Sequence, residues 1–468
     1  MSFRRHYFLN LSAQTLGRFI NTAGNFIIFF MVARVLGAEQ FGQYSYILTF
    51  LGLAVLVAEF GTNGVLAKQI VEFKDESRVY WGNFLMFRFC SSILVTILAI
   101  VVAYFIRFDL FDSLLMGSAC IIFISSRFFE PVFQVHQKPW YSLYPTVVFF
   151  LVYTVSSLTV LYLYESLFLI IVVYSLTNAI YILVAGYLST RVITPVFKFN
   201  AKHMKKLASL ALPAGLSNLF ILVHMRADIF MLAVMKTDYE VGIYNAAYKF
   251  LDIATIFAVV ISTPILPILS KYALDNRDLL RSRYMQFIEL IAIVTLPVAI
   301  ITPLISPLVV TVLFGTDYLP SAAVINVIVW IGVIVVYSVF LSTVLMAVER
   351  IHHMVWLGAV SACLNVLFNL WAIEHFSYMG AAWVTLVVEI FLISVTIYYI
   401  KNVLGCVARW KVWGKILVAN GLLAVASLIP LPPYLQLIVL PVVYLCGLFV
   451  LRVVTVEHVT SMRLFSEG

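Results

Sequence analysis

Fourteen apolar segments run through almost the whole chain and constrain its fold more than any other feature. Short polar turns separate them, and they lie at about residues 11–36, 42–66, 81–106, 113–136, 142–164, 167–189, 207–235, 242–270, 284–313, 321–348, 352–373, 378–400, 414–430 and 434–453. Roughly 20 apolar residues suffice for a helix to cross a bilayer. The apolar residues do not alternate with polar ones, as the strands of a transmembrane barrel require. We therefore predict an all-α polytopic membrane protein with 14 transmembrane helices.

The composition excludes several functional classes. The chain is 63% hydrophobic and only 11% charged, whereas a soluble domain carries about 25% charged residues. Its five cysteines show no metal-ligand or redox spacing, and no nucleotide-binding or metalloprotease motif is present. We expect no metal, no cofactor and no enzymatic activity. The net charge of +8 is explained by loop charge that fixes orientation, without nucleic-acid binding.

The distribution of lysine and arginine predicts the orientation. If the N-terminus lies inside, 22 of the 30 basic residues fall in inside segments, and only Arg107 and Lys236 fall in outside turns. Cytoplasmic loops carry such an excess of basic residues. We predict a multi-pass protein of the cell inner membrane with both termini cytoplasmic.

An internal repeat predicts the domain organisation. A shift of 200 residues places Gly42 on Gly242 and Tyr44 on Tyr244, at corners between corresponding helices. Six helices per half is an even number, so the two halves have the same orientation. The predicted divisions are an N-terminal six-helix bundle (1–190), a basic cytoplasmic linker (191–206), a second pseudo-symmetric six-helix bundle (207–401) and a pair of additional helices with the C-terminal tail (402–468).

Polar residues line one face of the first helix. Arg18, Asn21 and Asn25 are spaced by three and four residues, the spacing of one helix face. Such a stripe cannot face lipid. It either lines an aqueous cavity or makes hydrogen bonds to a neighbouring helix.

Further basic residues inside the predicted spans are candidates for binding an anion. Arg88 and Arg127 lie toward the cytoplasmic side, at a depth similar to that of Arg18, and Lys249 lies in the eighth helix. Charge within a membrane is costly, so its default interpretation is functional. The structural alternatives are that Arg88 extends to the interface, that Arg127 pairs with Glu130 and that Lys249 pairs with Asp252.

Acidic and titratable residues in the spans are candidates for coupling to an ion. They are Glu59, His224, Asp228 and Asp252. His224 and Asp228 share a helix face and could exchange a proton, although a hydrogen-bonded structural histidine fits equally well. Glu289 lies near a helix end, and we expect it at the membrane interface.

Several motifs, taken together and in order, resemble one family. The sequence ARVLGAEQFGQYS (33–45) is similar to the first loop of the polysaccharide-transporter branch of the multidrug/oligosaccharidyl-lipid/polysaccharide (MOP) flippase superfamily, which reads close to ARxLGxxxFGxYS. Further similarities lie at 227–250 (with VGIY), 264–272 (PILPILSKY), 313–322 (LFGTDYLPSA) and 365–385 (with the asparagine-rich NVLFN and GAA).

The resemblance implies both a fold and a function. The fold is two six-helix bundles of the kind found in MATE transporters, facing a central cavity and working by alternating access. Members of this branch flip undecaprenyl-pyrophosphate-linked oligosaccharide repeat units to the outer leaflet for surface polysaccharide biosynthesis. Arginine can contact a pyrophosphate through two hydrogen bonds, which fits Arg18, Arg88 and Arg127. The resemblance also implies coupling to protons or sodium and contact with membrane lipids and polysaccharide-assembly proteins.

Two other functions are compatible with a chain of this kind. A cation-coupled MATE-like exporter of drugs or metabolites would have the same fold, but we would expect its cavity to be acidic. A membrane glycan polymerase or ligase needs a sizeable outside loop for its acceptor, and the predicted outside turns are only a few residues long.

Overall fold

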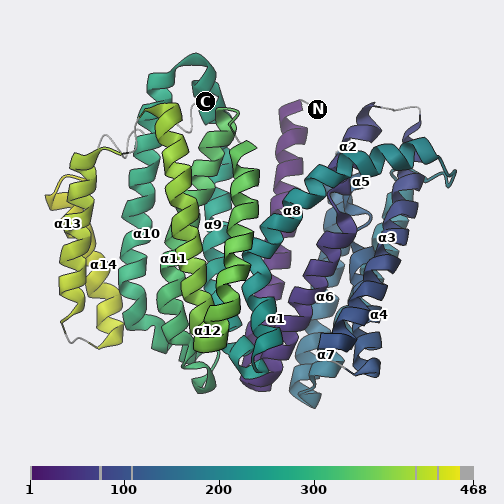
Figure 1. The fold of residues 1–468 in the computed structure, drawn as a ribbon, viewed down its shortest axis with the longest axis horizontal. Helices are drawn as coiled ribbons and strands as arrows, with labels where there is room; N and C mark the ends of the chain where they lie inside the picture. Colours follow the sequence, from purple (N-terminus) through teal and green to yellow (C-terminus); the bar gives the residue numbers. More distant parts are fainter. Residues whose placement is uncertain are drawn as a thin grey trace. The chain divides into compact units, whose positions relative to one another are not determined.

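The computed structural model describes residues 3–72, 76–106, 109–136, 138–350, 352–405, 408–429 and 432–453, and for residues 3–23 it describes the backbone alone. Across these ranges the regular structure is helical (Figure 1). The helices are α1 Phe3–Glu59, α2 Thr62–Glu72, α3 Ser77–Ile106, α4 Leu110–Ser126, α5 Glu130–Val135, α6 Pro139–Tyr164, α7 Leu167–Thr190, α8 Ala201–Met235, α9 Asp238–Asp275, α10 Arg277–Leu313, α11 Ser321–Ala347, α12 His352–Leu404, α13 Trp410–Ser427 and α14 Pro433–Val450, with a short 3₁₀ helix, η2, at Thr316–Tyr318. The all-α prediction is confirmed.

The predicted number of spans is not confirmed. Among the described residues, nine helical segments are long and apolar enough to cross a membrane, or ten if the bent α8 counts as one span. Two of them each contain two predicted segments. Helix α1 breaks only at Gly37 (φ 75°) and α12 only at Ser377 (φ 50°), where we expected turns of several residues. The chain is thus a multi-pass membrane protein whose helix-to-helix turns are tighter than the sequence indicated.

The chain forms two compact units, Met1–Gly242 and Ile243–Gly468. In the first unit α1 packs against α6, α3 against α4, and α6 against α7. Helix α8 also belongs to this unit: it packs against α1, α2 and α3, and Figure 1 shows its first half crossing over α2 and α5. It bends by 49° after Phe220. Packing therefore divides the chain after α8, whereas the division at 191–206 rests on the sequence repeat and stays a prediction.

Two glycines related by the repeat contact each other's corner. A Cβ on Gly42 would lie 1.8 Å from the carbonyl oxygen of Asp238, and a Cβ on Gly242 would lie 2.0 Å from the carbonyl oxygen of Ala38. Gln43 adds a hydrogen bond from its Nε2 to Asp238 Oδ2 at 2.9 Å. Only glycine lets the two backbones approach this closely.

The linker before α8 is fixed along the start of α3. Asn83 donates from Nδ2 to the carbonyl oxygen of Lys198 (2.9 Å), and its Oδ1 accepts from the backbone N–H of Asn200 (3.0 Å). The backbone N–H of Val196 donates to the carbonyl oxygen of Arg78 at 3.0 Å. The linker is therefore ordered by specific contacts.

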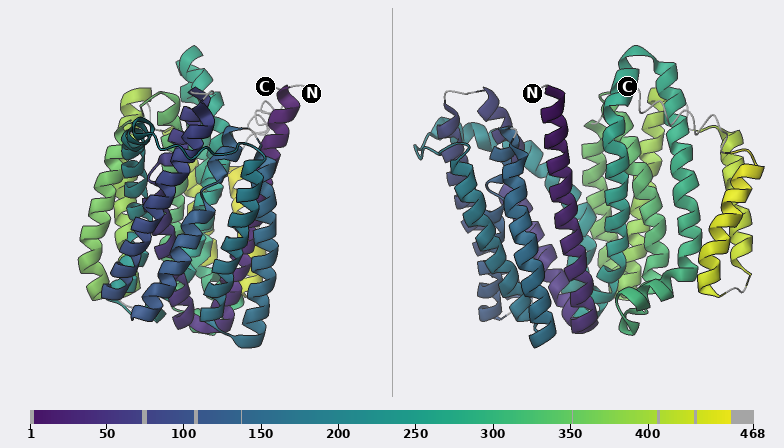
Figure 2. Two further views of the ribbon diagram at one scale, coloured as in Figure 1. Left: turned by 90° about the vertical axis from the view of Figure 1, so that its right-hand side faces the viewer. Right: turned by 180° about the vertical axis from the view of Figure 1, so that it is seen from behind.

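The second unit is built around α10, α11 and α12, with the α13–α14 hairpin packed against α10. Figure 2 shows this hairpin at the edge of the unit, beside α10. Arg409, just before α13, forms a two-hydrogen-bond ion pair with Glu289 of α10. The hydrogen bonds that Arg409 donates to the Glu289 carboxylate raise the pKa of Arg409 above its ordinary value. Glu289 is 3% exposed and thus buried within the protein, and its location at the membrane interface stays a prediction.

Candidate functional site

An ion pair between a buried arginine and a partly buried glutamate lies in the first unit. Arg88 of α3 donates from Nη2 to Glu59 Oε1 at 3.0 Å, and the Arg88 side chain is fully buried. Residue 59 ends α1 at a break formed by Phe60 and Gly61, both with positive φ, which turns the chain into α2. The structure thus brings together a predicted substrate cation and a predicted coupling carboxylate.

Arg88 keeps unused hydrogen-bonding capacity. Its Nε and Nη1 have no hydrogen-bond partner among the described residues. The guanidinium carbon lies 5.7 Å from the Phe84 ring centroid and 5.2 Å from that of Phe128, so aromatic faces provide part of its surroundings. Because five N–H groups are available on arginine and Glu59 uses one, the remaining donors can serve an anion.

Arg127 is the chain neighbour of Phe128, one of the two rings that contact Arg88. Arg127 caps the C-terminus of α4. The Arg127 guanidinium lies 5.4 Å from the Phe123 ring centroid, and Arg127 makes no ion pair with any described residue. The predicted alternative of pairing with Glu130 is not observed, since Glu130 accepts a hydrogen bond from Gln134 (3.3 Å).

Aromatic side chains extend from Arg127 into the helix bundle. Phe123 of α4 lies 5.4 Å from Tyr174 of α7, and Tyr174 lies 5.4 Å from Tyr153 of α6. The hydroxyl groups of Tyr153 and Tyr44 are 3.1 Å apart, which joins α6 to α1. Rings with polar tips can present both apolar faces and hydroxyl groups to one ligand. We call Arg88, Arg127, Tyr44, Tyr153 and Tyr174 the cation–tyrosine cluster.

The tyrosines of this cluster were missed by the sequence reasoning. Tyr44 and Tyr153 are 109 residues apart, and each lies in an apolar segment among many other aromatic residues. Tyr44 was noted only as a marker of the repeat. The one available signal was its alignment with Tyr244, which predicts a structural role as readily as a functional one.

The remaining predicted site residues lie elsewhere. Lys249 and Asp252 form an ion pair of 3.3 Å on α9 in the second unit, as the structural alternative predicted. In α8, Asp228 is 1% exposed and its Oδ1 accepts from the backbone N–H of Ile229 at 2.8 Å, while His224 is half-buried. Asn25 of α1 is exposed. The side chains of Arg18 and Asn21 lie outside the described residues.

Comparisons with known proteins agree with the motifs. The family model described as "Polysaccharide biosynthesis protein" matches residues 8–273. An uncharacterized membrane protein of Methanocaldococcus jannaschii, MJ1068, is 23% identical over 507 residues. The match covers 99% of each of the two chains.

Solved structures support the same fold. The lipid II flippase MurJ in an inward closed conformation is similar with a TM-score of 0.72 and 13% identity, over 94% of this chain and 98% of that one. An inward-facing MATE family multidrug resistance transporter of the MOP superfamily gives a TM-score of 0.64 and 12% identity, over 82% of this chain and 95% of that one. Because its family and structural neighbours comprise flippases and transporters, the prediction that the chain is not an enzyme is confirmed. The chain belongs to the polysaccharide biosynthesis protein family, and its MOP flippase fold is the one that the sequence motifs predicted.

Proposed function

We propose that the protein is a flippase that moves an undecaprenyl-pyrophosphate-linked oligosaccharide repeat unit across the cytoplasmic membrane by alternating access. The product would be used for surface polysaccharide biosynthesis. Membership of the polysaccharide biosynthesis family supports the glycan part of this proposal, and the likeness to a lipid II flippase fits a lipid-linked substrate.

The observation that carries the proposal is the buried Arg88 with two donor nitrogens left without a partner among the described residues. A buried cation is costly, and one acidic partner leaves most of its donors unsatisfied. A pyrophosphate offers several anionic oxygens and would satisfy them. Arg127 and, if it faces the same space, Arg18 would share the charge of the headgroup.

The aromatic part of the cation–tyrosine cluster fits the sugars. Tyr153 and Tyr174 offer ring faces for apolar sugar surfaces and hydroxyl groups for sugar hydroxyls. Glu59 would exchange between pairing with Arg88 and holding a proton or sodium ion, which couples substrate binding to the coupling ion. His224, Asp228 and Asp252 remain further candidates for coupling.

The test measures flipping of a fluorescent polyprenyl-pyrophosphate-linked sugar in proteoliposomes. Arg88→Gln alone leaves Glu59 without its cationic partner. The decisive variant therefore combines Arg88→Gln with Glu59→Gln, whose two neutral amides can still form a hydrogen bond. We expect stable insertion and at least a tenfold loss of flipping, because a hydrogen bond to a charged group contributes about 1.5–3 kcal/mol. Arg191→Gln is the matched control, since Arg191 is exposed and pairs with the Tyr187 hydroxyl. Flipping at the normal rate in the neutral-pair variant would contradict the proposal.

The alternative is a cation-coupled exporter of drugs or metabolites. The buried Asp228 favours it, because a carboxylate in a membrane helix can bind a cationic substrate or a coupling ion. An exporter would carry a lipophilic cation in the same vesicles and would lose that activity in Asp228→Asn. A flippase would transport the lipid-linked sugar and would not transport the cation.

A further inference from the structure

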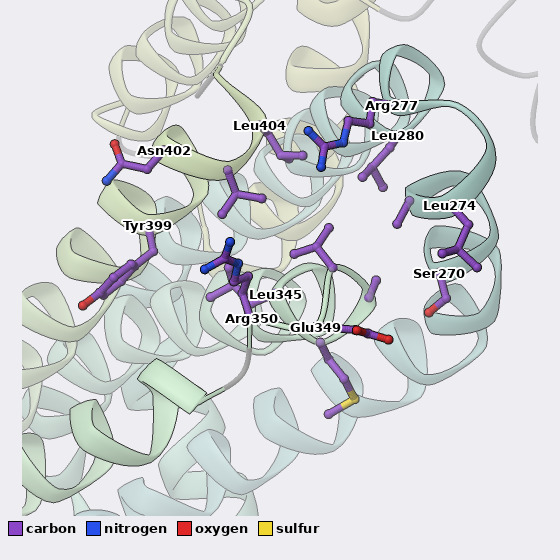
Figure 3. A pocket seen from close by; sticks show the side chains of 15 residues that line it. Ser270, Leu274, Arg277, Leu280, Leu345, Glu349, Arg350, Tyr399, Asn402 and Leu404 are labelled. Atoms are coloured by element: carbon purple, nitrogen blue, oxygen red, sulfur yellow. The ribbon is translucent and has the colours of Figure 1, made fainter.

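A second basic site lies in the other unit, far along the chain from the cation–tyrosine cluster. A cavity of about 670 Å³ lies beside the α9–α10 turn (Figure 3). It is lined by the end of α9, the start of α10, and the ends of α11 and α12. This volume is within the range of roughly 300–1,000 Å³ of small-molecule sites. The distribution of basic residues predicts that this end of the unit is cytoplasmic.

Two arginines line the cavity, and their guanidinium groups form no hydrogen bond or ion pair with the described residues. Arg277 is the first residue of α10, and Arg350 follows α11; Figure 3 shows them coming from different elements. Neither side chain makes a hydrogen bond or ion pair with a described residue. The nearby Arg281, in contrast, is committed to the carbonyl oxygen of Leu404 through Nε at 2.8 Å.

The turn that carries Arg350 is held in an unusual conformation. Glu349 has φ +57°, and the backbone N–H of Arg350 donates to the carbonyl oxygen of Leu345 at 2.8 Å. A non-glycine residue in this region of φ is uncommon and disfavoured. The turn fixes the backbone from which Arg350 enters the cavity, and Glu349 supplies the acidic side chain of the lining.

The rest of the lining is amphiphilic. Leu274 and Met346 are exposed and offer apolar surface, whereas Asn402 adds an amide that makes no hydrogen bond to a described residue. The two arginines outweigh Glu349, so the cavity carries a net positive charge. Its chemistry thus combines cations for an anionic group with apolar surface beside them.

We infer that this cavity binds a phosphate-bearing molecule, with Arg277 and Arg350 contacting the phosphate and Leu274 and Met346 contacting its apolar part. The phosphate can come from the headgroup of an anionic membrane lipid or from a soluble phosphorylated compound. The inference does not depend on the proposed flippase function, because it concerns different residues and is tested by binding without transport.

The experiment measures binding to the purified full-length protein in detergent by native mass spectrometry. The probes are dioleoyl phosphatidylglycerol, dioleoyl phosphatidylcholine as the zwitterionic lipid with the same tails, and glycerol phosphate as the soluble phosphate. The test variant is Arg277→Gln with Arg350→Gln. Its matched control is Lys271→Gln, which removes an exposed cation near the same turn but outside the lining.

We expect one tightly bound phosphatidylglycerol, and no equally tight phosphatidylcholine, in the wild type and the control. The double variant should bind it about tenfold more weakly or worse, which corresponds to the loss of 1.4 kcal/mol. If glycerol phosphate binds, if its binding is weakened by the double variant, and if phosphatidylglycerol does not bind, the natural ligand is a soluble phosphorylated compound. Equal binding by wild type and double variant, or no binding of either phosphate probe to the wild type, would overturn the inference. Arg350→Lys keeps the positive charge and should retain part of the affinity. This result would show that the weaker binding of the double variant does not come from misfolding.

Discussion

At the scale of single residues, Gly42 and Gly242 give the sharpest prediction about stability. Gly42→Ala would place a methyl group 1.8 Å from the Asp238 carbonyl oxygen, and backbone cannot move aside as a side chain can. We expect the free energy of unfolding to fall by about 1–3 kcal/mol, the usual cost of overpacking. Gly242→Ala should behave alike. Thermal unfolding of the purified protein in detergent measures the change.

The matched control is Gly52→Ala, in the same helix. A Cβ at Gly52 meets nothing within 4 Å, and its backbone is helical. Alanine favours a helix over glycine by roughly 0.5–1 kcal/mol, so this variant should equal or exceed the wild type. A similar loss of stability in both variants would mean that the clash is not responsible.

The same two glycines show how far the sequence can predict. The shift of 200 residues aligned the two glycines as equivalent corners of the two halves. A repeat does not indicate that equivalent positions contact each other, as these two do. Arg88 and Glu59 were each singled out as charges in a membrane span, yet their pairing was not predicted. Charge in an apolar helix is visible in one sequence, whereas the partner depends on packing between helices.

At the scale of elements, the contact between the linker and α3 gives a further prediction. Asn83→Ala removes the amide that holds Lys198 and Asn200, in a side chain that is 1% exposed. A loss of 1–2 kcal/mol changes a population by roughly 5- to 30-fold. We expect trypsin to cut at the exposed Lys198 and Lys202 faster by about that factor. Ser118→Ala, on the exposed surface of α4, should leave the rate unchanged, and an equal rate in Asn83→Ala would rule out this anchoring role.

A separate prediction concerns how the α13–α14 hairpin is attached. Arg409→Gln leaves the buried Glu289 carboxylate without its partner, and removing one member of a buried pair costs about 3–5 kcal/mol. Arg409 is one-third exposed, so we expect the lower figure of about 1–3 kcal/mol. Hydrogen exchange of the α13 amides should become faster. Adding Glu289→Gln should restore part of the protection, and failure to do so would show that the pair does not hold the hairpin.

The helices themselves were largely predictable, whereas their ends and partners were not. Long apolar segments leave little choice but a helix, because every backbone group must be bonded within the membrane. The sequence placed a turn around residue 37, and the helix does break there, but at Gly37 alone and not over several residues. The packing of α8 against α1, α2 and α3 could not be read from the basic linker, because contacts between helices depend on the fold and leave no local sequence signal.

At the scale of the whole molecule, charge asymmetry predicts how the chain lies in the membrane. Lys198 belongs to the basic linker and Lys236 to the turn between α8 and α9, at opposite ends of α8. The helix between them is one bent element that can cross the membrane as a single span. The two lysines should therefore face opposite compartments, with Lys198 in the cytoplasm.

Cysteine labelling of intact cells tests this orientation. The five native cysteines are first replaced, because Cys90, Cys363 and Cys446 are exposed in the structure and would react themselves. Single cysteines are then introduced as Lys236→Cys and Lys198→Cys. A membrane-impermeant maleimide should label the Lys236→Cys variant in intact cells, and should label the Lys198→Cys variant only after the membrane is opened. The reverse pattern would invert the topology. It would also place the arginine-lined cavity of the second unit outside the cell, where a cytoplasmic phosphate compound could not reach it.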